Sequence, residues 1–475
     1  MQKIYLLVIV ITSLVSTGYS AIQEGIDNII AKAPTDINIG VKIQSMDTGK
    51  VLYEKNADRY FMPASTQKTL TAAAALYYLG RDYTFKTTLY ASNAPRDKTI
   101  SGNLYIKFMA DPTLTTEDMR DLINQLTKQG IKRITGHVYL DNSFLDEKSY
   151  GSGWMWDDQN DCFSAPVNAI VLNHNCFDVN LRAGKHTGGP TQIEEINNDS
   201  ALIYTPVINH TITRDFTADD DACLLDVKVD SNNVYNLTGC VPPGSLQTLS
   251  FAINNVKPYS AQLIADLFKQ ADIQYEGSIG FASTPSSARE LASHYSEPLI
   301  NILVIMLKKS DNLIADTVFK TLGAVYFHQQ GNWRNGERAI RAILSQKANV
   351  KLLDDQILDG AGLSRYNLIT PNEMSQLLYA VYNNAHIGGD FIQGLPIAGV
   401  DGTLANKGGG RNSVLRSNIQ AKTGTMTGVL ALAGYIYTKQ NHILSIDIMM
   451  NNFPGKVYPY FYLEMQIADY LIRNE

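Results

Sequence analysis

The sequence has few of the residues and spacings on which metal and redox sites depend. Its 475 residues include four cysteines and eight histidines, with no C-x-x-C pair and no ligand spacing among the histidines from His137 to His442. Zinc sites are usually built from closely spaced cysteines and histidines. The G-x-S-x-G turn that carries the serine of many hydrolases is also absent. The sequence therefore predicts no metal and no cofactor.

Basic clusters and long apolar runs are scarce as well. The formal net charge is −6 at pH 7, which argues against binding to nucleic acid or to a strongly anionic membrane surface. Residues 1–20 combine one lysine, the apolar run Ile4–Ile11 and small residues before Ser20. This pattern is typical of a secretory signal peptide, and the run is short for a membrane-spanning anchor, which is the alternative. We expect an exported, periplasmic protein with at most peripheral membrane association.

The cysteines fit this compartment. They are Cys162, Cys176, Cys223 and Cys240. An even number of cysteines in an exported protein suggests two disulfides, here with three possible pairings. We favour the local pairs Cys162–Cys176 and Cys223–Cys240, each of which would stabilise the fold by roughly 3 kcal/mol.

Strand patterns occur at both ends of the chain. Asn38–Tyr53 alternates apolar and polar residues around a D-T-G-K turn, which predicts a β-hairpin. Three further strands are expected near the C-terminus, at Ser417–Thr425, Gly428–Thr438 and His442–Asn451. Helical spacing is found at Ile22–Ala33, Ser65–Leu79 and Tyr458–Arg473. We therefore predict an α/β (α+β) fold in which both ends of the chain contribute to one sheet covered by helices.

A long segment separates these two ends. Its strand-like runs are Thr84–Ala91, Gly102–Ala110, Ile134–Leu140, Phe177–Arg182 and Cys223–Val229. Two helices are expected, at Thr116–Gln129 and Tyr259–Ala271, and all four cysteines lie in the same segment. We infer that residues 89–289 form a large inserted β-rich region, as two nested domains, and that residues 21–88 and 290–475 form the split main domain.

The first string with a chemical meaning is Ser65-Thr66-Gln67-Lys68. Residues three apart on a helix share a face, so the lysine side chain can reach the serine hydroxyl. Serine is a poor nucleophile until a base removes its proton, and lysine is a base only when burial or a nearby cation lowers its pKa. Taken alone, the string also fits a capping serine beside an unrelated surface lysine.

Two more strings follow in order along the chain. Ser310-Asp311-Asn312 supplies a hydroxyl for proton relay and an amide that can hold a substrate amide. Lys422-Thr423-Gly424-Thr425 ends a predicted strand, where Thr423 and Thr425 can bind a carboxylate and Gly424 permits close backbone approach. Each of these strings alone is more often a turn, but the three together predict acyl transfer through a serine ester.

With these strings the chain resembles the low-molecular-mass, class C penicillin-binding proteins, the D-alanyl-D-alanine carboxypeptidases and endopeptidases of peptidase family S13. The resemblance covers nearly all of the chain after residue 20. It extends to further stretches: P-A-S-T-Q-K from Pro63, W-M-W-D-D from Trp154, D-G-A-G-L-S-R from Asp359 and G-V-D-G-T-L from Gly399. It implies a DD-peptidase-like fold with two extra domains between the first two strings.

The resemblance also implies roles for single residues. Ser65 would be the nucleophile, Lys68 its base, and Ser310 with Lys422 a proton relay. The substrate would be held by Asn312, Thr423, Gly424, Thr425 and Met426, with Asp157 or Asp158 at its side-chain amine. The oxyanion hole would be the backbone N–H groups of Ser65 and Thr425. The implied partners are peptidoglycan stem peptides and cross-links, with β-lactam antibiotics as covalent inhibitors.

Two other functions remain open from the sequence. A β-lactamase shares the strings, but in class A enzymes it uses a glutamate and a bound water for deacylation, and no such glutamate can be placed here. A penicillin-binding or sensory module would need no activity, although every catalytic position of the strings is intact.

Overall fold

The computed structural model describes residues 21–34, 37–195, 201–215, 223–352, 354–410 and 412–475. The predicted signal peptide lies outside these residues. The described chain forms two compact units, each built from separate stretches. The first unit holds the described residues up to Asp82 with Leu299–Asp311 and Trp333–Glu475, and the second holds Tyr83–Pro298 and Asn312–Asn332.

The first unit is built on a five-stranded antiparallel sheet with the order β19-β20-β21-β1-β2. Its strands are β1 (Asn38–Ser45), β2 (Val51–Lys55), β19 (Ile419–Met426), β20 (Val429–Tyr437) and β21 (Ile443–Asn451). β1 pairs with β21 along its whole length, so the two ends of the chain meet in one sheet. The predicted fold class is therefore confirmed.

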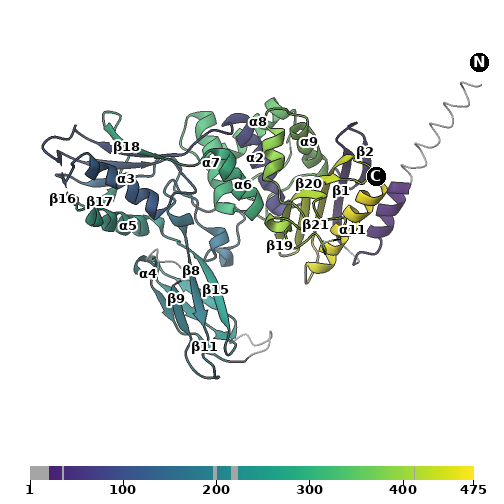
Figure 1. The fold of residues 1–475 in the computed structure, drawn as a ribbon, viewed down its shortest axis with the longest axis horizontal. Helices are drawn as coiled ribbons and strands as arrows, with labels where there is room; N and C mark the ends of the chain where they lie inside the picture. Colours follow the sequence, from purple (N-terminus) through teal and green to yellow (C-terminus); the bar gives the residue numbers. More distant parts are fainter. Residues whose placement is uncertain (1–20, 35–36, 196–200, 216–222, 353, 411) are drawn as a thin grey trace, which may run out of the picture. The chain divides into compact units, whose positions relative to one another are not determined.

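Helices cover both faces of this sheet (Figure 1). The helices of the unit are α2 (Lys68–Tyr78), α6 (Leu299–Lys309), α8 (Trp333–Ala348), α9 (Pro371–Tyr382), α10 (Gly388–Gly394) and α11 (Tyr458–Asn474). Residues 21–30 are also helical, and two short 3-10 helices are η1 (Ala64–Gln67) and η6 (Gly402–Leu404). On one face, Ile26 and Leu463 pack into a core with strand residues such as Leu432. On the other face, α9 lies along β1 and β21. The long apolar run of β20 is buried from Val429 to Ile436 because both faces are covered.

The second unit contains a five-stranded sheet with the order β17-β7-β5-β3-β18. Its strands are β3 (Lys86–Ala91), β5 (Leu104–Phe108), β7 (Val138–Asp141), β17 (Ile279–Phe281) and β18 (Arg289–Tyr295). A small sheet joins β4 (Thr99–Ile100), β6 (Arg133–Ile134) and β16 (Gln274–Tyr275), and the helices are α3 (Thr116–Lys128), α5 (Val256–Gln270) and α7 (Asn312–Phe327). The start of α3 carries a capping box between Thr115 and Asp118, which satisfies N–H groups of the first turn.

The remaining strands of this unit form three smaller sheets. They are β8 (Cys176–Arg182), β9 (Gln192–Glu195), β10 (Val207–Asn209), β11 (Ile212–Thr213), β12 (Asp226–Val229), β13 (Tyr235–Thr238), β14 (Cys240–Val241) and β15 (Leu246–Ala252). The short helices are α4 (Ala201–Tyr204), η2 (Trp156–Asp158), η3 (Cys162–Ser164) and η4 (Asn173–Asn175). Figure 1 shows β8, β9, β11 and β15 as a lobe beside α3 and α5. Disulfides join Cys162 to Cys176 and Cys223 to Cys240, the two local pairs favoured from the sequence.

The second unit extends beyond the predicted insert, residues 89–289, at both ends, and it also includes Asn312–Asn332. β3 pairs antiparallel with β18, so both ends of the insert share one sheet and the predicted limits at residues 89 and 289 fall at or inside these strands. The helix α7 also belongs to the second unit, where the buried amine of Lys320 lies 2.6 Å from a carboxylate oxygen of Asp146. The sequence had assigned this helix to the main domain.

No helix within the described ranges is both long enough and apolar enough to cross a membrane.

The close packing of β19 against β20 can be tested at Gly434. An ideal Cβ at this position would lie 2.4 Å from Ala421 Cα, the residue opposite it on β19. We expect Gly434→Ala to lower the free energy of unfolding by about 1–3 kcal/mol, because the strands must separate. Gly389→Ala on α10 is the matched control, since its Cβ would meet no atom within 4 Å. Urea unfolding measures both, and an unchanged midpoint for Gly434→Ala would contradict the contact.

Candidate active site

Ser65 lies at the beginning of the helical segment that runs from η1 into α2. The first turn, Ala64–Gln67, is a 3-10 helix, and the α-helix starts at Lys68. The sequence predicted one continuous helix instead. Ala64 has a φ of 45°, a conformation that costs a residue with a side chain on the order of 1–3 kcal/mol. The tight turn leaves Ser65 partly exposed while Lys68 is fully buried.

Lys68 is hydrogen-bonded to the serine three residues before it. Its Nζ donates to Ser65 Oγ at 2.9 Å and to the carbonyl oxygen of Ala361 at 2.7 Å. The side chain has no exposed surface. A buried amine within hydrogen-bond reach of a hydroxyl can exchange a proton with it, so this pair meets the geometric requirement for an activated serine.

The carbonyl group that fixes Lys68 belongs to a loop organised by Asp359. The carboxylate of Asp359 is fully buried and accepts hydrogen bonds from the N–H of Gly362 at 2.8 Å and of Ser364 at 2.6 Å. The Asn367 side-chain amide donates to the same carboxylate at 2.8 Å. Asp359 therefore folds the loop so that its carbonyl groups face α2. Sequence reasoning noted this stretch only as part of the family resemblance.

Other carbonyl groups of the same loop also bind the nucleophile segment. Gln67 Nε2 donates to the carbonyl oxygen of Asp359 at 3.2 Å, and Thr71 Oγ1 donates to that of Gly360 at 2.8 Å. Three consecutive carbonyl groups, from 359 to 361, thus bind side chains of residues 67–71. This contact fixes the position of the Ser65 turn from one side.

Two glycines allow the backbone to approach this turn closely. At Gly362, with a φ of 81°, an ideal Cβ would lie 1.8 Å from the carbonyl oxygen of Ala64. At Gly424, in β19, it would lie 2.7 Å from the carbonyl oxygen of Pro63 and 3.0 Å from the Ser65 nitrogen. The sequence explained Gly424 by close approach to a ligand, whereas the described contact is with the protein's own backbone.

A second serine–lysine pair lies on β19 and at the end of α6. Lys422 Nζ donates to Ser310 Oγ at 2.9 Å and to the carbonyl oxygen of Thr423 at 2.7 Å. Ser310 follows the last residue of α6 and has a φ of 61°. Burial holds the pKa of Lys422 well below its usual range, and the charges of Lys68 and Lys407 lower it further. This shift favours the neutral amine, which is the form that can accept a proton.

The threonines after Lys422 differ in their surroundings. Thr423 Oγ1 is 2.7 Å from Thr403 Oγ1, a hydrogen bond to η6. The loop before η6 is held by Lys308, whose Nζ lies 2.7 Å from a carboxylate oxygen of Asp401. Thr425 is exposed and Met426 is partly buried. Thr403 was not among the predicted site residues, although its G-V-D-G-T-L stretch was part of the resemblance.

The other predicted residues belong to the second unit. Asn312 begins α7 and its side-chain amide donates to the carbonyl oxygen of Phe163 at 2.8 Å. Asp157 and Asp158 lie in η2, next to Trp156, which is 81% exposed. Asp158 raises the pKa of Asp161, after the larger effect of burial. Substrate-binding roles for Asn312, Asp157 and Asp158 stay predictions.

Three or more metal-ligating side chains do not gather at any point in the described part of the chain. Within the first unit, the structure brings together Ser65 with Lys68 and Ser310 with Lys422, and the charge of Lys68 acts on Lys422. The arrangement provides two buried amines, each bound to a serine hydroxyl.

Comparison with known families gives one match that covers most of the chain. Residues 22–460 match the D-Ala-D-Ala carboxypeptidase 3 (S13) family. Among curated proteins, the chain is 33% identical over 436 residues to the D-alanyl-D-alanine carboxypeptidase DacB of Haemophilus influenzae, covering 90% of this chain and 88% of that protein. It is 28% identical over 446 residues to the D-alanyl-D-alanine carboxypeptidase of Actinomadura sp. strain R39, covering 91% and 81%.

The solved structures agree with this match. The crystal structure of penicillin binding protein 4 (dacB) from Haemophilus influenzae superposes with a TM-score of 0.85 at 31% identity, covering 94% of this chain and 99% of that one. The same protein in complex with a β-lactam gives a TM-score of 0.81 at 30% identity.

The low pKa of Lys422 predicts a pH dependence of stability. In the unfolded chain a lysine binds a proton below about pH 10.4. In the folded protein the buried amine of Lys422 binds a proton only at a lower pH. Stability should therefore fall as pH decreases from about 10.4 towards the folded pKa, with a limiting slope of about 1.4 kcal/mol per pH unit. Lys422→Met should remove this contribution, and Lys439→Met, at an exposed position, should leave it. Urea unfolding between pH 7 and 10.5 measures the slopes, and equal slopes for the parent and Lys422→Met would contradict the assignment.

Proposed function

Because this chain belongs to the D-Ala-D-Ala carboxypeptidase 3 (S13) family, we propose that it cleaves the D-Ala–D-Ala bond through an ester on Ser65. The observation that carries the proposal is the 2.9 Å hydrogen bond between Lys68 Nζ and Ser65 Oγ, made by an amine with no exposed surface. The neighbouring pair of Lys422 and Ser310 supplies a second proton carrier. The enzyme is a serine-type carboxypeptidase and needs no metal for this chemistry.

Acylation begins with attack of Ser65 Oγ on the carbonyl carbon of the penultimate D-Ala. Lys68 takes the hydroxyl proton as the bond to carbon forms. The carbonyl group of Ala361 fixes the amine by a second hydrogen bond, so the amine keeps its direction towards Ser65. A positive charge on Lys422 would oppose protonation of Lys68. Burial lowers the pKa of Lys422 and so disfavours that charge.

The tetrahedral intermediate places negative charge on the former carbonyl oxygen. We assign its stabilisation to the backbone N–H groups of Ser65 and Thr425. The close contact of Gly424 with the backbone of Pro63 and Ser65 supports this role, because it brings the end of β19 beside the nucleophile. Loss of one such donor typically costs about 2.7–4 kcal/mol of transition-state stabilisation.

Departure of the terminal D-Ala requires a proton on its amine. Ser310, which is hydrogen-bonded to Lys422, can pass to this amine the proton that Lys68 took from Ser65, so that both lysines are neutral again when D-Ala leaves. The carboxylate of the leaving D-Ala would bind Thr423 and the exposed Thr425. Water then attacks the ester carbonyl carbon, and Lys68 takes a proton from the water and gives it to Ser65 Oγ as the bond between Oγ and the acyl carbon breaks.

We propose peptidoglycan as the substrate, with stem peptides trimmed at D-Ala–D-Ala and cross-links cut at the D-Ala–diamino acid bond. Asn312 would hold the substrate amide, and Met426 with Asp157 or Asp158 would contact the side chain of the third stem residue. β-Lactams would acylate Ser65, as the β-lactam complex of the Haemophilus relative suggests. The two disulfides are typical of an exported protein, and we propose the periplasm as its location.

The nucleophile is tested with Ser65→Ala. The parent should release D-Ala from an acyl-D-Ala-D-Ala peptide and bind labelled penicillin in a one-to-one covalent complex, whereas Ser65→Ala should do neither. Ser345→Ala, at an exposed position of α8, is the control and should behave as the parent. Mass spectrometry of the intact protein after incubation gives the readout. Covalent labelling of Ser65→Ala would show that another residue is the nucleophile, and rapid turnover of penicillin by the parent would indicate a β-lactamase.

The positioning role of the Asp359 loop is tested with Asp359→Ala. Removing the carboxylate releases three hydrogen-bond donors and lets the carbonyl group of Ala361 move away from Lys68. Misplacement of a reacting group by about 1 Å can cost 10²-fold in rate, so penicillin acylation should slow by about that factor. The exposed Asp354 gives the control Asp354→Ala.

Stopped-flow acylation over a range of pH is the measurement, with thermal unfolding recorded to separate misfolding from misplacement. A folded Asp359→Ala protein that acylates at the parental rate, with an unchanged pH profile, would rule out the positioning role.

A further inference from the structure

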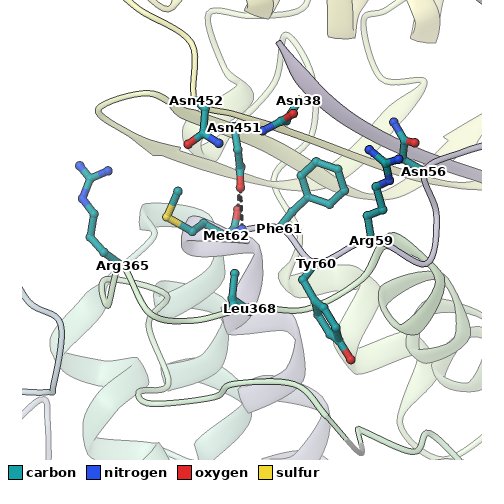
Figure 2. Close-up of a pocket in the computed structure, with 10 residues that line it drawn as sticks. All are labelled: Asn38, Asn56, Arg59, Tyr60, Phe61, Met62, Arg365, Leu368, Asn451 and Asn452. Carbon is teal, nitrogen blue, oxygen red and sulfur yellow. Dashed lines mark hydrogen bonds between the residues drawn. The ribbon is translucent and has the colours of Figure 1, made fainter. Parts of the chain in front are cut away.

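A pocket of about 340 Å³ lies in the first unit beside the segment that leads to Ser65 (Figure 2). Its lining includes Met62, three residues before the nucleophile, and the ends of β1 and β21 at Asn38 and Asn451. None of the mechanistic steps above uses its polar side chains. Its size is at the lower end of the range for ligand pockets and fits a short peptide segment.

The lining carries positive charge and amide groups but no carboxylate. It contains two arginines and four asparagines, in a chain whose formal net charge is −6. The Arg59 side chain is exposed and has no hydrogen-bond or ion-pair partner in the described part of the protein. Figure 2 shows Arg59 and Arg365 at opposite sides of the pocket. An unpaired guanidinium beside the amides of Asn38 and Asn452 is suited to a carboxylate on a peptide.

The floor of the pocket is held by the fold. Asn451 accepts a hydrogen bond from the Met62 N–H at 2.7 Å and donates to the Met62 carbonyl oxygen at 3.2 Å. Asn56 Nδ2 donates to the carbonyl oxygen of Ile39 at 2.8 Å. Phe61 is 3% exposed and packs against the Gly40 position, where a Cβ would meet its ring at 2.5 Å. The pocket is therefore preformed, while Arg59 at its rim is left for a ligand.

Arg365 connects the pocket with the strand of the proposed carboxylate site. Its guanidinium donates to the carbonyl oxygen of Thr427 at 2.8 Å, in the turn that follows Met426. A substrate bound along the end of β19 can therefore continue past this turn into the pocket. At the other side of the pocket, the partly exposed ring of Tyr60 offers an apolar surface next to Arg59.

We propose that this pocket binds a carboxylate-bearing peptide, namely the second stem of a cross-linked substrate, with Arg59 as the group that pairs with the carboxylate. This inference rests on the proposed function, because only a cross-linked substrate carries a second stem. Arg59 would select long substrates and take no part in bond cleavage. The amides of Asn38 and Asn452 would bind peptide groups of the same stem.

The test measures binding in the full-length Ser65→Ala protein, so that no substrate is consumed. Calorimetry compares a purified cross-linked disaccharide-peptide dimer with a short acyl-D-Ala-D-Ala peptide. Adding Arg59→Ala should raise the Kd for the dimer about tenfold, in keeping with loss of a charge-assisted hydrogen bond, and change the Kd for the short peptide less than twofold. Arg59→Lys should recover part of the loss. The control is Arg334→Ala, at an exposed position of α8 with no partner among the described residues, and it should change neither Kd.

Four results would overturn the inference. Equal losses of affinity for the dimer and the short peptide in Arg59→Ala would show that Arg59 acts on the active site through the Met62 segment. Unchanged dimer binding in Arg59→Ala, or equal affinity for a dimer whose carboxylates are amidated, would remove the carboxylate contact. Competition by the free disaccharide would indicate a sugar site instead. Failure of the proposed function has a separate readout: the parent protein, without substitutions, would release no D-Ala from an acyl-D-Ala-D-Ala peptide.

Discussion

The proposed chemistry depends on two amines that are buried next to serine hydroxyls. Lys68 and Lys422 have no exposed surface, and each donates a hydrogen bond to a serine and another to a backbone carbonyl oxygen. Desolvation opposes a positive charge on each, and a charge on one opposes a charge on the other. Burial therefore favours the neutral form of these amines, which is the form that can accept a proton in the proposed mechanism. The fold buries the two lysines, and in the proposed mechanism the hydroxyls of Ser65 and Ser310 transfer the proton.

The fold achieves this by bringing two segments of distant sequence against one turn. Gly424 of β19 and Gly362 of the Asp359 loop touch the Pro63–Ser65 backbone at distances that no side chain permits. The turn itself includes Ala64 in a left-handed conformation, and Ser310 shares this feature. Such strained residues persist only where surrounding contacts impose them. The same contacts that bury the lysines therefore also hold both serines in place.

The sequence predicts the side chains of this site better than the scaffold that orients them. Ser65 and Lys68 are three residues apart on a helical segment, so their contact follows from local geometry alone. The contact of Ser310 with Lys422 spans the chain and was inferred only from the set of three strings. The proposed positioning role of Asp359 was not predicted, because Asp359 acts through backbone carbonyl groups. A sequence pattern does not show where those groups point. The sequence could not fix the limits of the insert to the residue, because the pairing of β3 with β18 is a long-range contact.

The sheet beneath the site adds a further condition for a neutral Lys422. Strand register places Lys422 opposite Ala433, and Ala433 opposite Asp447, so the lysine and the acid share one row on one face of the sheet. An ionised Asp447 would favour the charged form of Lys422. Burial raises the pKa of Asp447 well above its usual range, and the nearby Glu464, whose own pKa is raised to about 8, adds to this effect. Neither carboxyl group of the pair is fully hydrogen-bonded in the described structure. Burial therefore favours the neutral form of these acids, as it favours the neutral form of the amine, and Lys422 donates its side-chain hydrogen bond to the Ser310 hydroxyl.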